Sequence, residues 1–211
     1  MDKTRFKYSK TGKAMYISQL DLMATMQRSF LRAGINLKYS EGFNPHPYMS
    51  VALPLPVGCE SICELMDVRI ADRKLPDIKA IKLPEGLAIL DTYVPTRKFN
   101  EITWIEISGI MNYDKQTDND FVKKLALCFS KESIVISKRT KRGFKDIDIA
   151  PYIKDIKFGM EKHITISAKI SAMNPTLNTD DIINAIDEKL RPEFISVKRI
   201  AIYDSNMIEF I

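Results

Sequence analysis

Residues 40–48, Ser-Glu-Gly-Phe-Asn-Pro-His-Pro-Tyr, combine residue types that suit binding or catalysis. His46 stands between two prolines, which stiffen its backbone, and an imidazole serves as general acid or base near neutral pH. The same histidine could equally be a surface hydrogen-bonding residue. Phe43 and Tyr48 offer rings on which a base could stack. Because loops carry function more often than the elements they join, we predict a site here. Its supporting polar residues would be Ser40 and Asn44.

Cations precede this loop. Arg28 and Arg32 follow Asp21 by seven and eleven residues, so the three share one stripe of a predicted helix. This stripe is either a solvated salt-bridge face or a phosphate-binding face on which Asp21 orients one arginine. Lys38 adds another cation just before the loop.

Residues 138–145 form a second basic stretch, Lys-Arg-Thr-Lys-Arg-Gly-Phe-Lys. Such a run is commonly a solvated loop. It could also hold phosphates, because lysine and arginine contacts dominate nucleic-acid affinity and Phe144 could stack on a base. The cations assigned to binding in this stretch are Arg139, Lys141 and Arg142.

Metal and cofactor chemistry find little support. Cys59 and Cys63 have the C-x3-C spacing that opens a radical S-adenosylmethionine (SAM) cluster motif, but Met66 stands where the third cysteine would be needed. Buried free cysteines are the alternative. The chain contains no Walker A, G-x-G-x-x-G or G-x-S-x-G motif. We therefore expect no metal and no cofactor.

Composition indicates a cytoplasmic protein with an anionic partner. Of the net charge of +5, residues 1–60 supply +4, from eight Lys and Arg against four Asp and Glu. Three cysteines, an odd number, argue against a disulfide framework. The N-terminal residues lead into no apolar signal region, and no run of about 18 apolar residues is present, so we expect no membrane association.

The predicted elements of the first half follow the order β-α-β-β-α-β. The helix opens at Ser18 with a capping-box-like Ser-x-x-Asp, carries an apolar stripe through Met26 and Phe30, and ends before Gly34. A half-buried strand at 4–9 precedes it, with Phe6 and Tyr8 on one face, and a turn begins at Lys10. The remaining predictions are strands at 35–39, 49–53, 62–70 and 87–94 and a short helix at 76–82.

The order recurs after a linker at residues 95–100. The predicted strands are 102–107, 133–137, 163–170 and 195–203, and the predicted helices are 118–129 and 178–190. The fold class is therefore α+β, with two tandem ferredoxin-like (β-α-β-β-α-β) halves at residues 1–95 and 100–211. The first half holds the site loop at residues 40–48.

Four segments carry a family resemblance: residues 16–22, 32–34, 39–47 and 53–58. They read Tyr-Ile-Ser-Gln-Leu-Asp-Leu, Arg-Ala-Gly, Tyr-Ser-Glu-Gly-Phe-Asn-Pro-His-Pro and Leu-Pro-Leu-Pro-Val-Gly. The chain resembles the uncharacterised bacterial family of radical SAM-linked proteins over about residues 3–70, and more weakly at 139–141 and 148–153. The chain itself lacks a radical SAM barrel, so the resemblance implies a standalone member with a radical SAM partner rather than a particular reaction.

A more distant, fold-level similarity is to the tandem ferredoxin-like RNA-processing endoribonucleases of CRISPR systems. Fold alone does not give function. The leading hypothesis is an RNA-binding accessory protein that works with a radical SAM enzyme in RNA modification or processing, with no DNA specificity. One alternative is an enzyme, either a metal-independent ribonuclease or a small-anion transferase, that uses His46 with Arg28 or Arg32. Another is a module that docks the radical SAM protein through the surface at residues 54–58.

Overall fold

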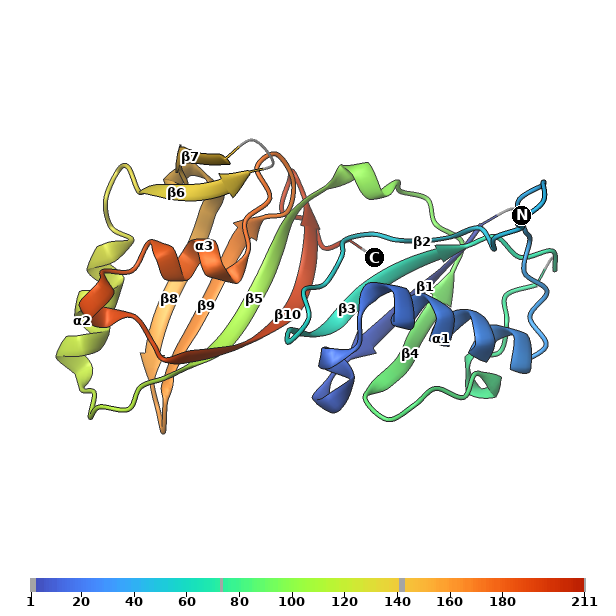
Figure 1. Cartoon of the computed structure of the whole chain (residues 1–211), viewed down its shortest axis with the longest axis horizontal. Coiled ribbons are helices and arrows are strands. Elements are labelled where there is room, and N and C mark those ends of the chain that lie inside the picture. Colours follow the sequence, from blue (N-terminus) through green and yellow to red (C-terminus); the bar gives the residue numbers. More distant parts are fainter. Residues whose placement is uncertain (1–2, 73, 141–142, 211) are drawn as a thin grey trace. The chain divides into compact units, whose positions relative to one another are not determined.

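The chain folds into two compact units, Met1–Glu101 and Ile102–Ile211, which we call unit 1 and unit 2. The computed structural model shown in Figure 1 describes residues 3–72, 74–140 and 143–210. Both units are mixed α+β, with mostly antiparallel strands and few helices among the described residues. The division lies next to the linker predicted at residues 95–100.

Unit 1 contains a four-stranded antiparallel sheet in the order β4-β1-β3-β2. Its central strand β1 pairs with β3 on one side and β4 on the other, so the N-terminal strand has a neighbouring strand along both edges. The strands are β1 (Thr4–Lys10), β2 (Met49–Val51), β3 (Glu60–Val68) and β4 (Leu87–Tyr93). The described residues of this unit also include the 3₁₀ helices η1 (Gly12–Tyr16), η2 (Ile78–Ala80) and η3 (Phe99–Glu101).

Helix α1 (Gln19–Arg32) lies along one face of this sheet (Figure 1). It begins where the sequence predicts, because the Ser18 hydroxyl caps it by accepting the backbone N–H of Asp21 at 3.1 Å. Leu22, Met26 and Phe30 form its buried stripe, and the Phe30 ring stacks on Phe6 with 4.6 Å between ring centroids. The predicted helix is therefore confirmed.

Unit 1 departs from the prediction in two elements. Residues 35–39 form no strand and make only isolated bridges, because the backbone of Lys38 bonds to two different segments, at Arg69 and Tyr48. The helix predicted at 76–82 is reduced to η2, because Pro76 and Pro84 leave too little chain between them for a longer helix.

Strand β1 is also more enclosed than predicted. Arg5 is only 1% exposed, although the alternation placed it on the polar face of a half-buried strand. Lys10 is the buried last residue of β1 rather than part of a turn, and its Nζ donates to the carbonyl oxygen of Ile17 at 2.8 Å. Burial lowers the pKa of Lys10, and the nearby Glu64 partly offsets that effect.

Unit 2 is built on four antiparallel strands in the order β10-β5-β9-β8. Its strands are β5 (Ile102–Asn112), β8 (Ile153–Met160), β9 (Ile164–Ser171) and β10 (Phe194–Asp204), and its helices are α2 (Asn119–Cys128) and α3 (Thr179–Asn184). One face of the sheet is apolar and buried, as shown by Ile105 and Ile107 of β5 and Ile166 and Ile170 of β9. Phe129, at the end of α2, packs on Phe158 of β8 with 5.7 Å between the ring centroids.

A hairpin is inserted between α2 and β8. The strand predicted at 133–137 belongs to this hairpin, β6 (Val135–Thr140) paired with β7 (Gly143–Asp148), and not to the main sheet (Figure 1). Strand β8, which follows η4 (Ala150–Tyr152), takes that place beside β9 and was not predicted. Its alternation is interrupted at Asp155, where φ is +52° and the pairing with β9 shifts register.

The helix predicted at 178–190 is divided. Asn178 and Asp181 form a capping box at the start of α3, as expected for a helix that begins here. The helix ends at Asn184 because the Arg191 side chain donates to the carbonyl oxygens of Asn184 and Ile186, at 3.2 and 3.0 Å. A separate 3₁₀ turn, η5 (Glu188–Leu190), then leads to β10.

Candidate nucleic-acid interface

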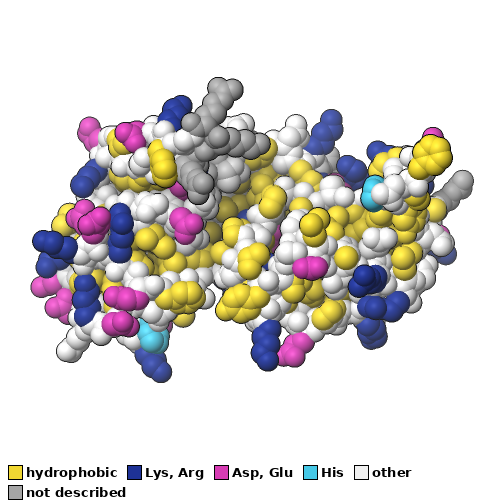
Figure 2. All heavy atoms as spheres, in the orientation of Figure 1, with side chains coloured by type: hydrophobic (Ala, Val, Ile, Leu, Met, Phe, Trp, Pro, Cys, Tyr) yellow, Lys and Arg dark blue, Asp and Glu magenta, His cyan; other side chains and the backbone are white. Residues whose placement is uncertain are grey.

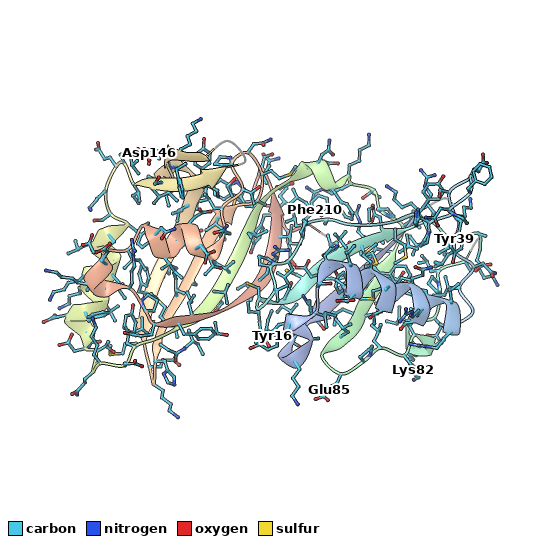
Figure 3. All side chains as sticks on the ribbon, viewed as in Figure 1. Tyr16, Tyr39, Lys82, Glu85, Asp146 and Phe210 are labelled. Carbon is cyan, nitrogen blue, oxygen red and sulfur yellow. The ribbon has the colours of Figure 1, made fainter. Side chains whose placement is uncertain are left out.

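Residues 38–48 form a narrow antiparallel loop held by its own backbone. The N–H of Tyr48 donates to the carbonyl oxygen of Lys38 at 2.9 Å, and the N–H of Ser40 donates to that of His46 at 2.8 Å. The Ser40 hydroxyl accepts the N–H of His46 at 3.0 Å. Gly42 has φ of +116°, a conformation that favours glycine, and so allows the reversal at the tip. Figure 3 labels Tyr39 at the base of this loop.

The tip presents Phe43 to solvent. This side chain is fully exposed, at 112% of its reference area, although a phenylalanine ring normally contributes to a core. His46 is exposed as well, and its ring makes no hydrogen bond within the described part of the chain. The loop therefore offers an apolar ring for stacking, whereas His46 has no partner in that part of the chain that would orient it as an acid or base.

A cation and a ring meet beside the loop. The Arg69 guanidinium carbon lies 4.7 Å from the centroid of the Tyr48 ring, close enough for a cation–π contact. Backbone hydrogen bonds fix both residues, because Arg69 N–H donates to Tyr48 and Lys38 N–H donates to Arg69, each at 2.9 Å. A pocket of about 260 Å³ opens next to them, and its lining includes Lys3, Ser50 and Asp67.

Asp67 is a buried anion at this pocket and is held by a bidentate arginine. Arg5 donates from Nε to Oδ1 at 2.6 Å and from Nη2 to Oδ2 at 3.0 Å, and Lys3 Nζ lies 3.4 Å from Oδ2. The Arg5 guanidinium also bonds to the Arg97 carbonyl oxygen and lies over the Phe99 ring at 4.2 Å. This network fixes the Asp67 carboxylate, and burial raises the pKa of the adjoining Tyr93 despite the nearby Arg5 charge.

The predicted cations of α1 are not part of this group. Arg28 and Arg32 are exposed, and Arg32 Nη2 donates to Ser29 within the helix at 2.9 Å. Asp21 accepts the Ser18 hydroxyl at 2.7 Å, so its role is at the helix start. Because Val68 faces α1, strand alternation directs Asp67 and Arg69 to the opposite face. Figure 2 shows Lys and Arg side chains gathered near α1.

The second predicted basic stretch is the β6–β7 hairpin. Phe144 is 76% exposed there, as a stacking role requires. Lys138 instead anchors the hairpin, because its Nζ donates to the Thr176 carbonyl oxygen and to the Asp181 carboxylate. Lys141, Arg142 and the Arg139 side chain lie outside the described residues.

The described residues show no arrangement of side chains suited to cysteine or metal chemistry. Cys59, Cys63 and Cys128 are not joined in disulfides, and Cys63 packs against Ser61 with 3.6 Å between sulfur and hydroxyl oxygen. Residues 3–72, 74–140 and 143–210 hold no group of three or more His, Cys, Asp or Glu side chains placed to bind a metal ion.

Sequence reasoning missed Arg69, Lys3 and the Arg5–Asp67 pair. A signal was present, because Arg5 and Asp67 each interrupt the apolar residues of a strand, and buried charges occur in pairs. Which arginine meets which carboxylate depends on the pairing of β1 with β3, where Arg5 lies opposite Asp67.

The fold and this loop-borne interface define a mixed α+β protein with two antiparallel-sheet units. The chain belongs to a bacterial family described as "Uncharacterized protein conserved in bacteria (DUF2344)", whose model matches residues 3–192. This membership confirms the coarser part of the resemblance, that the chain belongs to an uncharacterised bacterial family. No curated protein matches the chain. Among the described residues, no helix is long and apolar enough to cross a membrane.

One solved structure similar to the chain is titled "Crystal Structure of an Unknown Protein from Galdieria sulphuraria". Its sequence is 8% identical, the match covers 100% of this chain and 99% of that one, and the TM-score is 0.24.

Proposed function

We propose that this protein is an RNA-binding accessory protein that works with a radical SAM enzyme in RNA modification or processing. The radical SAM partner rests on the family resemblance of residues 16–58. The proposal of RNA binding rests on one observation. Phe43 is fully exposed on a loop that backbone hydrogen bonds hold beside the Tyr48–Arg69 pair. Proteins recognise single-stranded RNA by stacking bases on aromatic rings and on guanidinium planes. Lys3, half-exposed at the pocket rim, adds a cation that could meet a phosphate.

The sheet orders support a finer description of the fold. In both units the first strand lies between the third and fourth strands of the main sheet, and the second strand is at the edge. This strand order supports a ferredoxin-like unit, in unit 2 with the β6–β7 hairpin as an insertion. We propose two tandem ferredoxin-like units on this basis.

The direct test is binding of fluorescently labelled single-stranded RNA at low salt, where electrostatic binding is strongest. Replacement of Phe43 by alanine is expected to weaken binding about tenfold, since stacking on an aromatic ring contributes about 1–3 kcal/mol per base. The control is Leu20→Ala, which also removes an exposed apolar side chain but lies in the first turn of α1. Absence of RNA binding by the unmodified protein would refute the proposal.

A second candidate function, docking of a protein partner, is favoured by an exposed apolar surface. The N–H of Gly58 donates to the Met15 carbonyl oxygen at 3.0 Å and so brings exposed Val57 beside exposed Tyr16. Leu20, also exposed, follows in α1, and Figure 3 labels Tyr16 where that helix begins. Apolar groups of this kind on a soluble protein mark interaction surfaces.

Purification of the tagged protein from its host cells separates the two functions. A protein partner held by apolar contacts should remain bound at high salt, and Val57→Asp should release it, whereas Leu90→Asp on β4 should not. RNA recovered only at low salt, with no protein partner sensitive to Val57→Asp, would argue against docking through this surface.

A further inference from the structure

The sheet of unit 2 has a second face that its helices leave open. Side chains alternate along a strand, so the residues of β5 next to buried Ile105 and Ile107 point the other way. Trp104 and Ser108 of β5 are on this face, paired across to Ser171 and Ser167 of β9. Ser108 and Ile110 are exposed, and Trp104 is half-buried. We call this surface, with Lys154 and Lys157 of β8, the open face.

The handedness of the strand–helix–strand connections places α2 and α3 on the face of the sheet opposite the open face. Helix α2 connects β5 to β8, and α3 connects β9 to β10, and each connection joins parallel strands of one sheet. Such connections are right-handed in almost all proteins. The two connections cross the sheet in opposite directions, and the strands they join also point in opposite directions. Right-handed connections therefore place both helices on the same face of the sheet. Figure 1 shows α3 in front of this sheet, and α2 is held there by the Phe129–Phe158 contact.

The open face combines an indole ring with lysines. Lys154 Nζ lies 4.2 Å from the centroid of the Trp104 ring, within cation–π range. The neighbouring anions are engaged, because Asp155 accepts Lys169 Nζ at 2.9 Å and Glu106 accepts the Tyr203 hydroxyl at 2.5 Å. Lys157 is exposed on the same edge strand. The surface therefore has a positive edge next to a ring.

We infer that the open face binds a single-stranded segment of RNA, with a base stacked on Trp104 and phosphates on Lys154 and Lys157. This inference rests on the proposed RNA-binding function and adds a site on unit 2. A four-stranded antiparallel sheet with aromatic side chains on its uncovered face is a general mode of single-stranded RNA recognition. Base–aromatic stacking is stronger than an exposed cation–π contact, so a base displaces Lys154 from the ring, and the released ammonium meets the phosphate.

The chain carries its own reporter at this site, because Trp104 is its single tryptophan. The experiment adds a short single-stranded RNA of mixed sequence to the full protein and follows tryptophan emission together with the anisotropy of a labelled copy of the RNA. We expect emission to fall in step with the rise in anisotropy. A rise in anisotropy with unchanged emission would overturn the open-face site and leave the proposed function intact. No rise in anisotropy would overturn both.

Three variants sharpen the test. Lys154→Gln is expected to reduce the salt slope of binding by about 0.7, as loss of one phosphate contact on single-stranded RNA does. The control Lys124→Gln removes an exposed lysine of α2, on the helical side, and should leave the slope unchanged. Trp104→Leu keeps an apolar side chain without the ring and should weaken binding about tenfold. Equal slopes for the two lysine variants would contradict the site.

Discussion

At the residue scale, Arg5 and Asp67 set the geometry of the candidate interface in unit 1. Both are nearly fully buried, at 1% and 3% exposed, and two hydrogen bonds join them. A buried pair of this kind adds little net stability, but removal of one partner leaves an uncompensated buried charge. The pair therefore fixes where the Asp67 carboxylate lies at the pocket beside Arg69.

We predict that Asp67→Ala destabilises the fold by about 3 kcal/mol, because Arg5 would keep its charge in a buried site. Urea unfolding followed by circular dichroism measures this change. Lys3→Ala removes the other cation near Asp67, and the Lys3 side chain is half-exposed at 3.4 Å, so its effect should stay below about 1 kcal/mol. Similar losses for the two variants would contradict a dominant role of the Arg5–Asp67 pair.

Arg69 and Arg28 offer a comparison of two exposed arginines. Arg69 lies against Tyr48 at the loop, whereas Arg28 is on α1, which covers the other face of the sheet. We expect Arg69→Ala to weaken RNA binding about fivefold or more and Arg28→Ala to have less than a twofold effect. Anisotropy titrations of both variants provide the measurement. A larger loss of RNA binding for Arg28→Ala than for Arg69→Ala would contradict this interface and indicate the α1 stripe instead.

At the element scale, the β6–β7 hairpin is fastened at its base by Asp148. Its Oδ1 accepts the N–H groups of Ile134 and Ala150 at 2.8 and 3.0 Å. These backbone hydrogen bonds, with one from the Ser133 side chain, lower the pKa of Asp148. The hairpin carries exposed Phe144, so its attachment determines where that ring is presented.

The lowered pKa gives a pH prediction. The ionised Asp148 stabilises the fold above the ordinary carboxyl pKa of about 3.9, and this contribution is lost as pH falls through the lower folded value. Asp148→Asn should therefore show a smaller loss of stability below about pH 4 than the unmodified protein. Thermal unfolding midpoints between about pH 2 and pH 6 measure the difference. Parallel curves for both proteins would show that Asp148 does not titrate as proposed.

At the scale of the whole molecule, charge sets how the protein meets an anionic partner. The net charge of +5 is modest, so affinity should come from local contacts rather than from the overall field. About four phosphate contacts, from Arg69 and Lys3 in unit 1 and Lys154 and Lys157 in unit 2, correspond to a salt slope of about −2.8 for single-stranded RNA.

We therefore expect RNA affinity to fall roughly fifty-fold when monovalent salt rises from about 50 to about 200 mM. Titrations at several salt concentrations give the slope directly. A slope near zero would mean that binding does not depend on these cations, and a slope much steeper than about −2.8 would mean that further cations take part.

The sequence alone determined the local features. Ser18 starts α1, Met26 and Phe30 form its buried stripe, and the loop at residues 40–48 lies between elements, because caps, periodicity and turn residues act over a few neighbouring positions. It did not reveal β8, since the backbone at Asp155 breaks the strand alternation. The helix predicted at 178–190 was too long, because Arg191 binds the carbonyl oxygens of Asn184, the last residue of α3, and of Ile186.

Only the tertiary structure decided which charged residues share a site. Strand pairing set Arg5 opposite Asp67, residues separated by sixty-two positions, and backbone bonds from the loop brought Tyr48 to Arg69. Strand alternation then directed these residues away from the face that α1 covers, and so separated them from Arg28. Register and face are properties of long-range pairing, and residue types within one segment do not encode them.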